Sequence, residues 1–105
     1  MKVLFDQGTP VPLRRHLTGH VVDTAFECGW SNLKNGELLD AADRDGYGLL
    51  ITTDQNLKHQ QNLVGRKLAI LQLPTNHWPT LKRHAREIAM AVADLKPGDY
   101  IELQF

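Results

Sequence analysis

The 105-residue chain has little of what several protein classes require. Its single cysteine, Cys28, excludes an intrachain disulfide and a zinc site built from several thiolates. The 12 Lys and Arg residues balance the 12 Asp and Glu residues, so the net charge is zero, which argues against a broad basic surface for nucleic acid. No apolar run is long enough for a membrane span or a signal peptide. We therefore expect a cytoplasmic protein that does not associate with membranes.

Several catalytic motifs are also absent. The sequence contains no Gly-rich phosphate loop, no Gly-x-Ser-x-Gly elbow and no pair of histidines at metal-ligand spacing. Nucleotide-dependent chemistry and serine hydrolysis are therefore disfavoured. No internal repeat indicates a solenoid.

What is present is the composition of an ordinary globular domain spanning residues 1–105, with 42% apolar and 23% charged residues. Short apolar runs alternate with helical patterns. This order predicts an α/β fold, a three-layer sandwich with a mostly parallel central sheet of about five strands and helices on both faces. The strands are predicted at residues 2–5, 20–23, 49–51, 68–73 and 100–105. The last strand is expected at an edge, where an antiparallel direction is also open.

Five helices are predicted between these strands. Asn35 is expected to cap the helix that ends at Gly46, and Thr80 the longest helix. Trp30 and Trp78 are placed in loops, with packing or a dimer contact as the favoured role for each. The remaining helices are predicted at residues 11–17, 24–28 and 55–62, and the longest at residues 81–95.

Acidic residues stand where such a fold forms its sites, outside the carboxyl ends of parallel strands. Asp6 directly follows the first strand, and Asp54 closely follows the apolar strand 49–51. Glu37 lies in the first turn of a helix, and Asp40 can share its face. Converging carboxylates suit Mg²⁺ or Mn²⁺, which can activate water for phosphodiester cleavage. The competing interpretation is that these acids are ordinary turn and helix-start residues.

Four segments, taken in order, resemble the motifs of one family. Residues 4–10 (LFDQGTP) resemble an opening strand followed by an acidic triplet and a proline, and residues 19–22 (GHVV) resemble the family's second strand. Residues 35–42 (NGELLDAA) are similar to its acidic helix, and residues 46–57 contain its LITTDQNL signature. The family whose motifs they resemble is a short branch of the PIN-like family.

The resemblance implies a PIN-like ribonuclease that uses Mg²⁺ or Mn²⁺, as in the toxins of toxin–antitoxin modules. Asp6, Glu37 and Asp54 would be the catalytic, metal-binding acids, with Asp6 as anchor and Glu37 as ligand or water-orienting base. Thr52 would position the Asp54 turn by hydrogen bonding. The implied partners are an RNA substrate and an antitoxin protein. A homodimer is left open by the dimer contact considered for Trp30 and Trp78.

The chain departs from the family's pattern at three positions, where the acids are replaced by Gln7, Asn35 and Asn56. These amides lower the negative charge and should weaken Mg²⁺ binding, although each keeps an acceptor oxygen. A sluggish nuclease and a non-catalytic PIN-like module that binds a protein or RNA would both carry such a site. A phosphoacceptor or flavodoxin-like domain is a further alternative, but Pro74 stands where a late-strand lysine would be needed.

Basic residues follow the two strand-end acids. Arg14 and Arg15 come just after Asp6, and Lys58 comes just after Asp54. If these residues flank the acids, they could hold RNA phosphates. Solvated helix faces are the competing interpretation.

Overall fold

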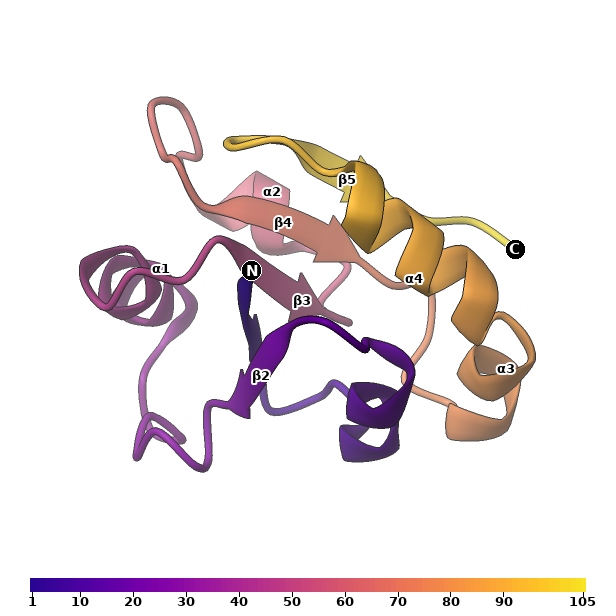
Figure 1. Ribbon diagram of the computed structural model, residues 1–105. Helices are drawn as coiled ribbons and strands as arrows, with labels where there is room; N and C mark the ends of the chain where they lie inside the picture. The colour runs from indigo at the N-terminus through magenta and orange to yellow at the C-terminus, as the bar shows by residue number, and fades with distance from the viewer.

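The computed structural model describes residues 1–105 and contains a five-stranded sheet in the order β2-β1-β3-β4-β5. All strand pairs are parallel, and Figure 1 shows the strands lying side by side between helices. The strands are β1 (Lys2–Phe5), β2 (Val21–Thr24), β3 (Leu49–Thr52), β4 (Ala69–Gln72) and β5 (Tyr100–Glu102). The helices are the 3₁₀ helix η1 (Val11–His16), α1 (Asn35–Arg44), α2 (Leu57–Gln60), α3 (Trp78–Arg83) and α4 (Ala85–Asp94).

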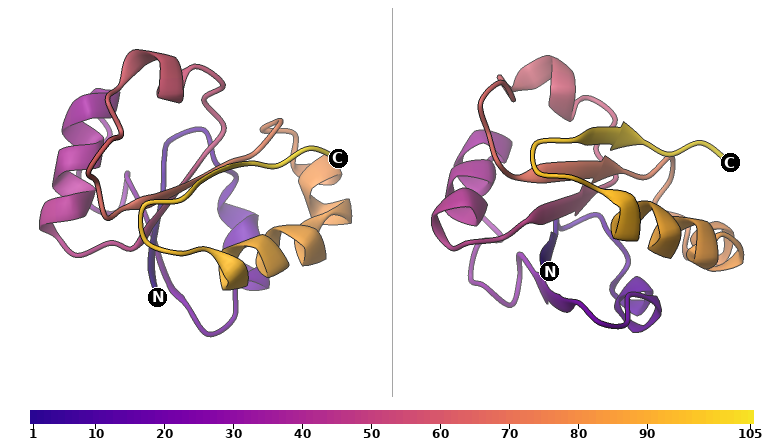
Figure 2. Two further views of the ribbon diagram at one scale, coloured as in Figure 1. Left: turned by 90° about the horizontal axis from the view of Figure 1, so that it is seen from above. Right: turned by 45° about the horizontal axis from the view of Figure 1, so that its top comes forward.

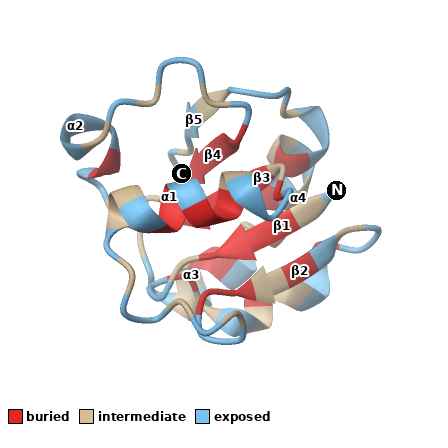
Figure 3. Cartoon of the chain, turned by 90° about the vertical axis from the view of Figure 1, so that its left-hand side faces the viewer, coloured by how far each residue is buried: buried red, intermediate tan, exposed pale blue.

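Helices cover both faces of the sheet, as the sequence predicts, because alternate residues of each strand point to opposite faces. Val3 and Phe5 of β1 pack with η1, α3 and α4 in one cluster. Leu4, between them, belongs to a second cluster with α1 and α2. Figure 2 shows the two helical layers on either side of the sheet, and Figure 3 shows burial concentrated in the central strands. None of the helices combines the length and apolar character that a membrane crossing requires.

The chain reverses its direction of progress across the sheet between β1 and β3. β2 lies on one side of β1, whereas β3, β4 and β5 follow on the other. In open parallel sheets such a switch point leaves a crevice outside the carboxyl ends of the strands, where ligands bind. Here the switch point is marked by Asp6, after β1, and Thr52, at the end of β3.

β5 is the expected edge strand, and of the two directions left open it takes the one parallel to β4. Several other local expectations were wrong. In the segment 24–28, expected as a helix, Thr24 ends β2 and residues 25–28 form turns. The expected helix 81–95 is two helices, α3 and α4, separated at His84, and Trp78 begins α3 instead of lying in a loop. Thr80 therefore lies inside α3 and is not an N-cap.

Candidate active site

Asp6 is anchored at the end of β1 by its neighbours on both strands. Its backbone N–H donates to the Ile51 carbonyl at 3.2 Å. Its Oδ1 accepts from the Thr9 backbone N–H at 3.1 Å and lies 2.7 Å from the Thr9 hydroxyl, while Oδ2 accepts from the Thr52 hydroxyl. The carboxyl group is therefore held at the switch point rather than free in solvent.

The Thr9 hydroxyl lies within hydrogen-bond distance of two acceptors but has only one proton to donate. Thr9 Oγ1 lies 2.7 Å from Asp6 Oδ1 and 2.9 Å from the Ile51 carbonyl oxygen. A hydroxyl donates only one proton, and an ionised carboxylate and a carbonyl can only accept. With Asp6 ionised, one of these two contacts lacks a proton. A proton on Asp6 supplies the missing hydrogen bond, whereas a cation beside the carboxylate would instead offset the repulsion between the facing oxygen lone pairs.

Burial also favours the protonated form of Asp6. Removal from water raises the pKa of the Asp6 carboxyl above its ordinary range, and the hydrogen bonds from Thr52 and Thr9 offset this only in part. A raised carboxyl pKa at a strand end is typical of groups that exchange a proton for a ligand.

Asp54 is held by three hydrogen bonds, two to its carboxylate and one from its backbone N–H. Its Oδ2 accepts from Asn35 Nδ2 at 2.8 Å, and its Oδ1 accepts from the Asn56 backbone N–H at 2.9 Å. Its own backbone N–H donates to Thr52 Oγ1 at 3.0 Å. The expected hydrogen bond between Thr52 and the Asp54 turn is thus present, and the same hydroxyl joins Asp54 to Asp6.

Asn35 does not act as the N-cap that the sequence predicts. It is the first residue of α1, after the N-cap residue Lys34, and its side chain turns to Asp54. The helix start is instead closed by Glu37, whose Oε1 accepts from the Lys34 backbone N–H at 3.1 Å.

The other predicted acids have structural contacts of their own. Glu37 is exposed and has Oε2 without a hydrogen-bond donor in the protein. Asp40 pairs with Arg66 at 2.9 Å, as does Asp43 at 2.7 Å, so Asp40 takes no part in the contacts around Asp6 and Asp54. No group of three or more His, Cys, Asp or Glu side chains is arranged to hold a metal ion.

The amides at the acid positions are placed differently from one another. Gln7 Nε2 donates to the Ser31 carbonyl at 3.3 Å. Asn56 contributes its backbone N–H to Asp54, and its side chain makes no hydrogen bond. Of the three amides, only Asn35 places its side chain on an acid of the site.

The predicted basic residues separate into different surroundings. Arg14 makes two hydrogen bonds to Glu27, at 2.8 and 3.2 Å, and this contact lowers the pKa of the Glu27 carboxyl. Arg15 is exposed. Lys58 is paired with Glu102 at 2.5 Å, at the edge strand β5. Arg14 is thus the basic side chain that shares a cleft with Asp6.

Two features of the site escaped sequence reasoning. Thr9 follows Asp6 by three residues, a spacing at which a side chain can close a turn on an acid, and this was the available signal. The second is a pair of linked amides, the exposed Gln55 and the buried Gln72. Gln55 Nε2 donates to the Leu73 carbonyl at 2.7 Å, and Gln72 Nε2 donates to Gln55 Oε1 at 2.9 Å. The signal there was a glutamine within an otherwise apolar strand.

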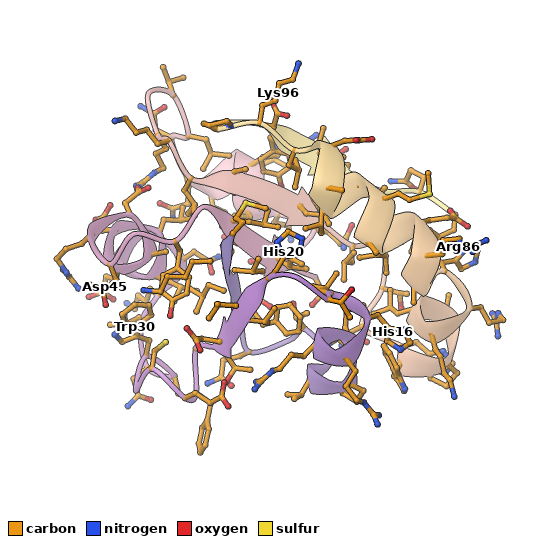
Figure 4. All side chains as sticks on the ribbon, in the orientation of Figure 1. His16, His20, Trp30, Asp45, Arg86 and Lys96 are labelled. Atoms are coloured by element: carbon orange, nitrogen blue, oxygen red, sulfur yellow. The ribbon has the colours of Figure 1, made fainter.

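The two tryptophans have the packing roles favoured by the sequence. Trp30 packs against the core beside Tyr47, with ring centroids 6.0 Å apart. Trp78 packs against the opposite core, 5.8 Å from the His16 ring. Figure 4 labels Trp30 and His16 on their separate sides of the molecule.

The chain matches no family model, no curated protein and no solved structure. The chemistry of the site therefore has to be argued from its own residues.

Proposed function

We propose that the protein is a divalent-metal-dependent ribonuclease of PIN-like type that hydrolyses phosphodiester bonds. The observation that carries the proposal is the Thr52 hydroxyl, which contacts the Asp6 carboxylate and the Asp54 backbone N–H at the β1–β3 switch point. One hydroxyl thus links the Asp6 carboxylate to the backbone of Asp54, at the edge of the sheet where parallel sheets bind ligands.

Two carboxylates are available to a hard cation, fewer than the three-residue group that the structure lacks. Asp6 and Asp54 provide carboxylate oxygens, and Mg²⁺ is commonly held by one or two carboxylates together with water and substrate phosphate. The missing proton between Thr9 and Asp6 also favours a positive charge at this carboxyl group. The amides of Gln7, Asn35 and Asn56 leave the site less negative than a cluster of acids, so we expect weak binding.

Each acid has a separate role in this proposal. Asp6 and Asp54 would hold Mg²⁺ or Mn²⁺, which supplies Lewis-acid activation of water and of the phosphate. Glu37, with Oε2 free, would orient the attacking water and accept its proton. Arg14 and Arg15 would contact RNA phosphates, whereas Lys58 would first have to leave Glu102.

The biological setting proposed for this activity follows from the PIN-like resemblance of residues 2–73. It is a toxin-like component of a toxin–antitoxin module, acting on RNA in the cytoplasm. An antitoxin protein would be its regulator, and homodimerisation is part of the same proposal.

A non-catalytic PIN-like module that binds a protein or RNA is the second candidate. The Asn35–Asp54 hydrogen bond favours it, because a protein amide already occupies an oxygen that a cation would use. The hydrogen bond that Glu37 Oε1 accepts at the start of α1 also favours the non-catalytic module, because it already occupies one oxygen of that carboxylate.

Cleavage of single-stranded RNA with Mn²⁺ tests the first candidate. We expect Asp54→Asn to abolish cleavage without unfolding the chain. We expect Glu37→Gln to slow cleavage by roughly tenfold or more, while changing the free energy of unfolding by less than about 0.5 kcal/mol, because glutamine also closes a capping box. Asp40→Asn is the matched control, since its partner is Arg66. Equal cleavage by the wild type and both site variants would contradict the proposal.

Calorimetric titration with Mn²⁺ separates the two candidates. A saturable heat that is lost in Asp54→Asn supports the nuclease. The absence of binding at millimolar Mn²⁺ would favour the non-catalytic module.

A further inference from the structure

A cleft of about 300 Å³ opens beside Asp6, between η1 and the turn that follows β2. We name it the Phe26 cleft. Its lining includes Val11 and Arg14 from η1 and Phe26 and Glu27 from the turn. The volume is at the lower end of the range for small-ligand sites, which suits a single unit of a polymer rather than a long segment.

The apolar part of this cleft is open to solvent. Phe26 is 75% exposed and Val11 is 54% exposed, although both belong to residue types that a small domain normally covers. An exposed aromatic ring next to a polar cleft is the kind of surface on which a nucleic-acid base stacks, because every base has a π-face.

The turn that presents Phe26 is firmly held. The Thr24 backbone N–H donates to Glu27 Oε1 at 2.9 Å, and the Glu27 backbone N–H donates back to Thr24 Oγ1 at 3.1 Å. The Ala25 N–H donates to the Phe5 carbonyl at 2.8 Å, which ties the turn to the end of β1. Phe26 therefore projects from a fixed backbone, which lowers the conformational entropy lost when a ligand binds.

Arg14 has donors to spare within the cleft. Two of its N–H groups are occupied by Glu27, and its Nε is buried without an acceptor. Nε is closed off from solvent, so the terminal N–H groups that Glu27 does not use are the donors that a ligand in the cleft can reach. A phosphate oxygen is a good acceptor for such a fork of donors.

We propose that the Phe26 cleft is a one-nucleotide subsite for single-stranded RNA, with the base against Phe26 and Val11 and the adjoining phosphate on Arg14. This inference rests on the proposed ribonuclease function and identifies where its substrate is held. Because the cleft also contains Asp6, the phosphate held there lies next to the proposed metal site.

The charges of the cleft make cation dependence part of the inference. Asp6 and Glu27 are acidic and Arg14 is basic, so the lining is net acidic when Asp6 is ionised and repels a phosphate. A divalent cation at Asp6 reverses this sign. RNA affinity should therefore rise when Mn²⁺ is added at constant ionic strength.

Binding of a fluorescein-labelled, phosphorothioate-linked oligoribonucleotide, followed by anisotropy in Mn²⁺, tests the subsite without relying on cleavage. We expect Phe26→Ala to weaken binding by about 5- to 100-fold, the usual effect of losing one stacking side chain, and Phe26→Tyr to restore it. Met90→Ala, an exposed apolar residue on α4, is the matched control and should bind like the wild type. The Arg14→Ala variant should bind more weakly, with Arg86→Ala as its control, because Arg86 lies outside the cleft on α4 (Figure 4).

The Glu27→Gln variant should change RNA affinity in the opposite direction. It removes a negative charge and weakens the hold on Arg14, so we expect affinity to rise roughly threefold or more. Glu87→Gln is its control, since Glu87 is likewise an acid paired with a basic side chain, His84, but lies on α4. A gain in Glu27→Gln together with a loss in Phe26→Ala would support the subsite.

The outcomes separate this inference from the function on which it rests. Wild-type binding or cleavage of RNA, with Phe26→Ala equal to Met90→Ala, would overturn the subsite alone. A wild-type chain that neither binds nor cleaves RNA in Mn²⁺ would overturn both.

Discussion

Asn35 Nδ2 donates a hydrogen bond to Asp54 Oδ2 at 2.8 Å, from the first residue of α1 to the turn after β3. The neutral amide stabilises the Asp54 carboxylate with a hydrogen bond, without any ion. An acid at position 35 would face another acid at this distance and would need a cation or a proton between them. We therefore expect the site to be stable without metal when residue 35 carries an amide, and to depend on metal when it carries a carboxylate.

The substitution Asn35→Asp tests this relationship. Without metal at neutral pH, we expect it to lower the free energy of unfolding by about 1–2 kcal/mol through the loss of a hydrogen bond and the repulsion of two carboxylates. Mn²⁺ should restore the loss and bind roughly tenfold more tightly than in the wild type. Thermal unfolding with and without Mn²⁺ measures both effects.

Asn76→Asp is the control for that change, because Asn76 is exposed and outside the site. If Asn35→Asp unfolds at the same temperature in Mn²⁺ as in chelator, residue 35 does not face a cation.

Asp6→Asn should alter the pH dependence of stability. Burial raises the pKa of Asp6 in the folded chain, so its stabilising contribution is complete below the ordinary aspartate pKa of about 3.9 and is lost as pH rises through the folded value. Asparagine does not titrate. We therefore expect the variant to gain stability relative to the wild type as pH increases, and to be the more stable form at pH 7 in chelator.

Urea unfolding of both chains across pH 4 to 8 measures this difference, and contributions from the other titrating groups largely cancel between them. A constant difference across the range would show that the Asp6 carboxyl has an ordinary pKa.

The Thr52→Val variant measures how much the shared hydroxyl contributes to stability and to Mn²⁺ binding. Thr52 is 1% exposed, and valine has nearly its shape, but the Asp54 N–H and Asp6 Oδ2 would each lose a partner. We expect a loss of about 1–3 kcal/mol in the free energy of unfolding and a sharp fall in Mn²⁺ affinity.

Thr52→Ser is the matched variant, because it keeps the hydroxyl and removes one methyl group at a cost of about 1 kcal/mol. Chemical denaturation and calorimetry on both chains distinguish the hydroxyl from the methyl. Valine and serine variants with the same Mn²⁺ affinity would show that the hydroxyl does not organise the site.

The strands and the class of fold could be predicted because each depends on local patterning. Leu49-Leu50-Ile51 is apolar on every residue, which is the pattern of a strand buried on both faces, and Asp6 stands at a strand end in the sequence itself. The break at His84 was hidden because residues on both sides of it, Leu81 and Ile88, continue one apolar stripe. The direction of β5 was also hidden, because strand alternation does not depend on direction.

Which acids and bases exist, and that Asp6 and Asp54 follow parallel strands, can be read from the order of residues along the chain. What each side chain contacts depends on segments far apart in that order. Asn35 meets Asp54 across 19 positions, Thr52 meets Asp6 across 46, and Arg14 meets Glu27 across 13. A hydrogen bond needs an approach of about 3 Å, and local patterning places an element on the correct face of a sheet without specifying distances at that scale. The identity of the charged groups is thus a property of the sequence, while their pairing is a property of the packed chain.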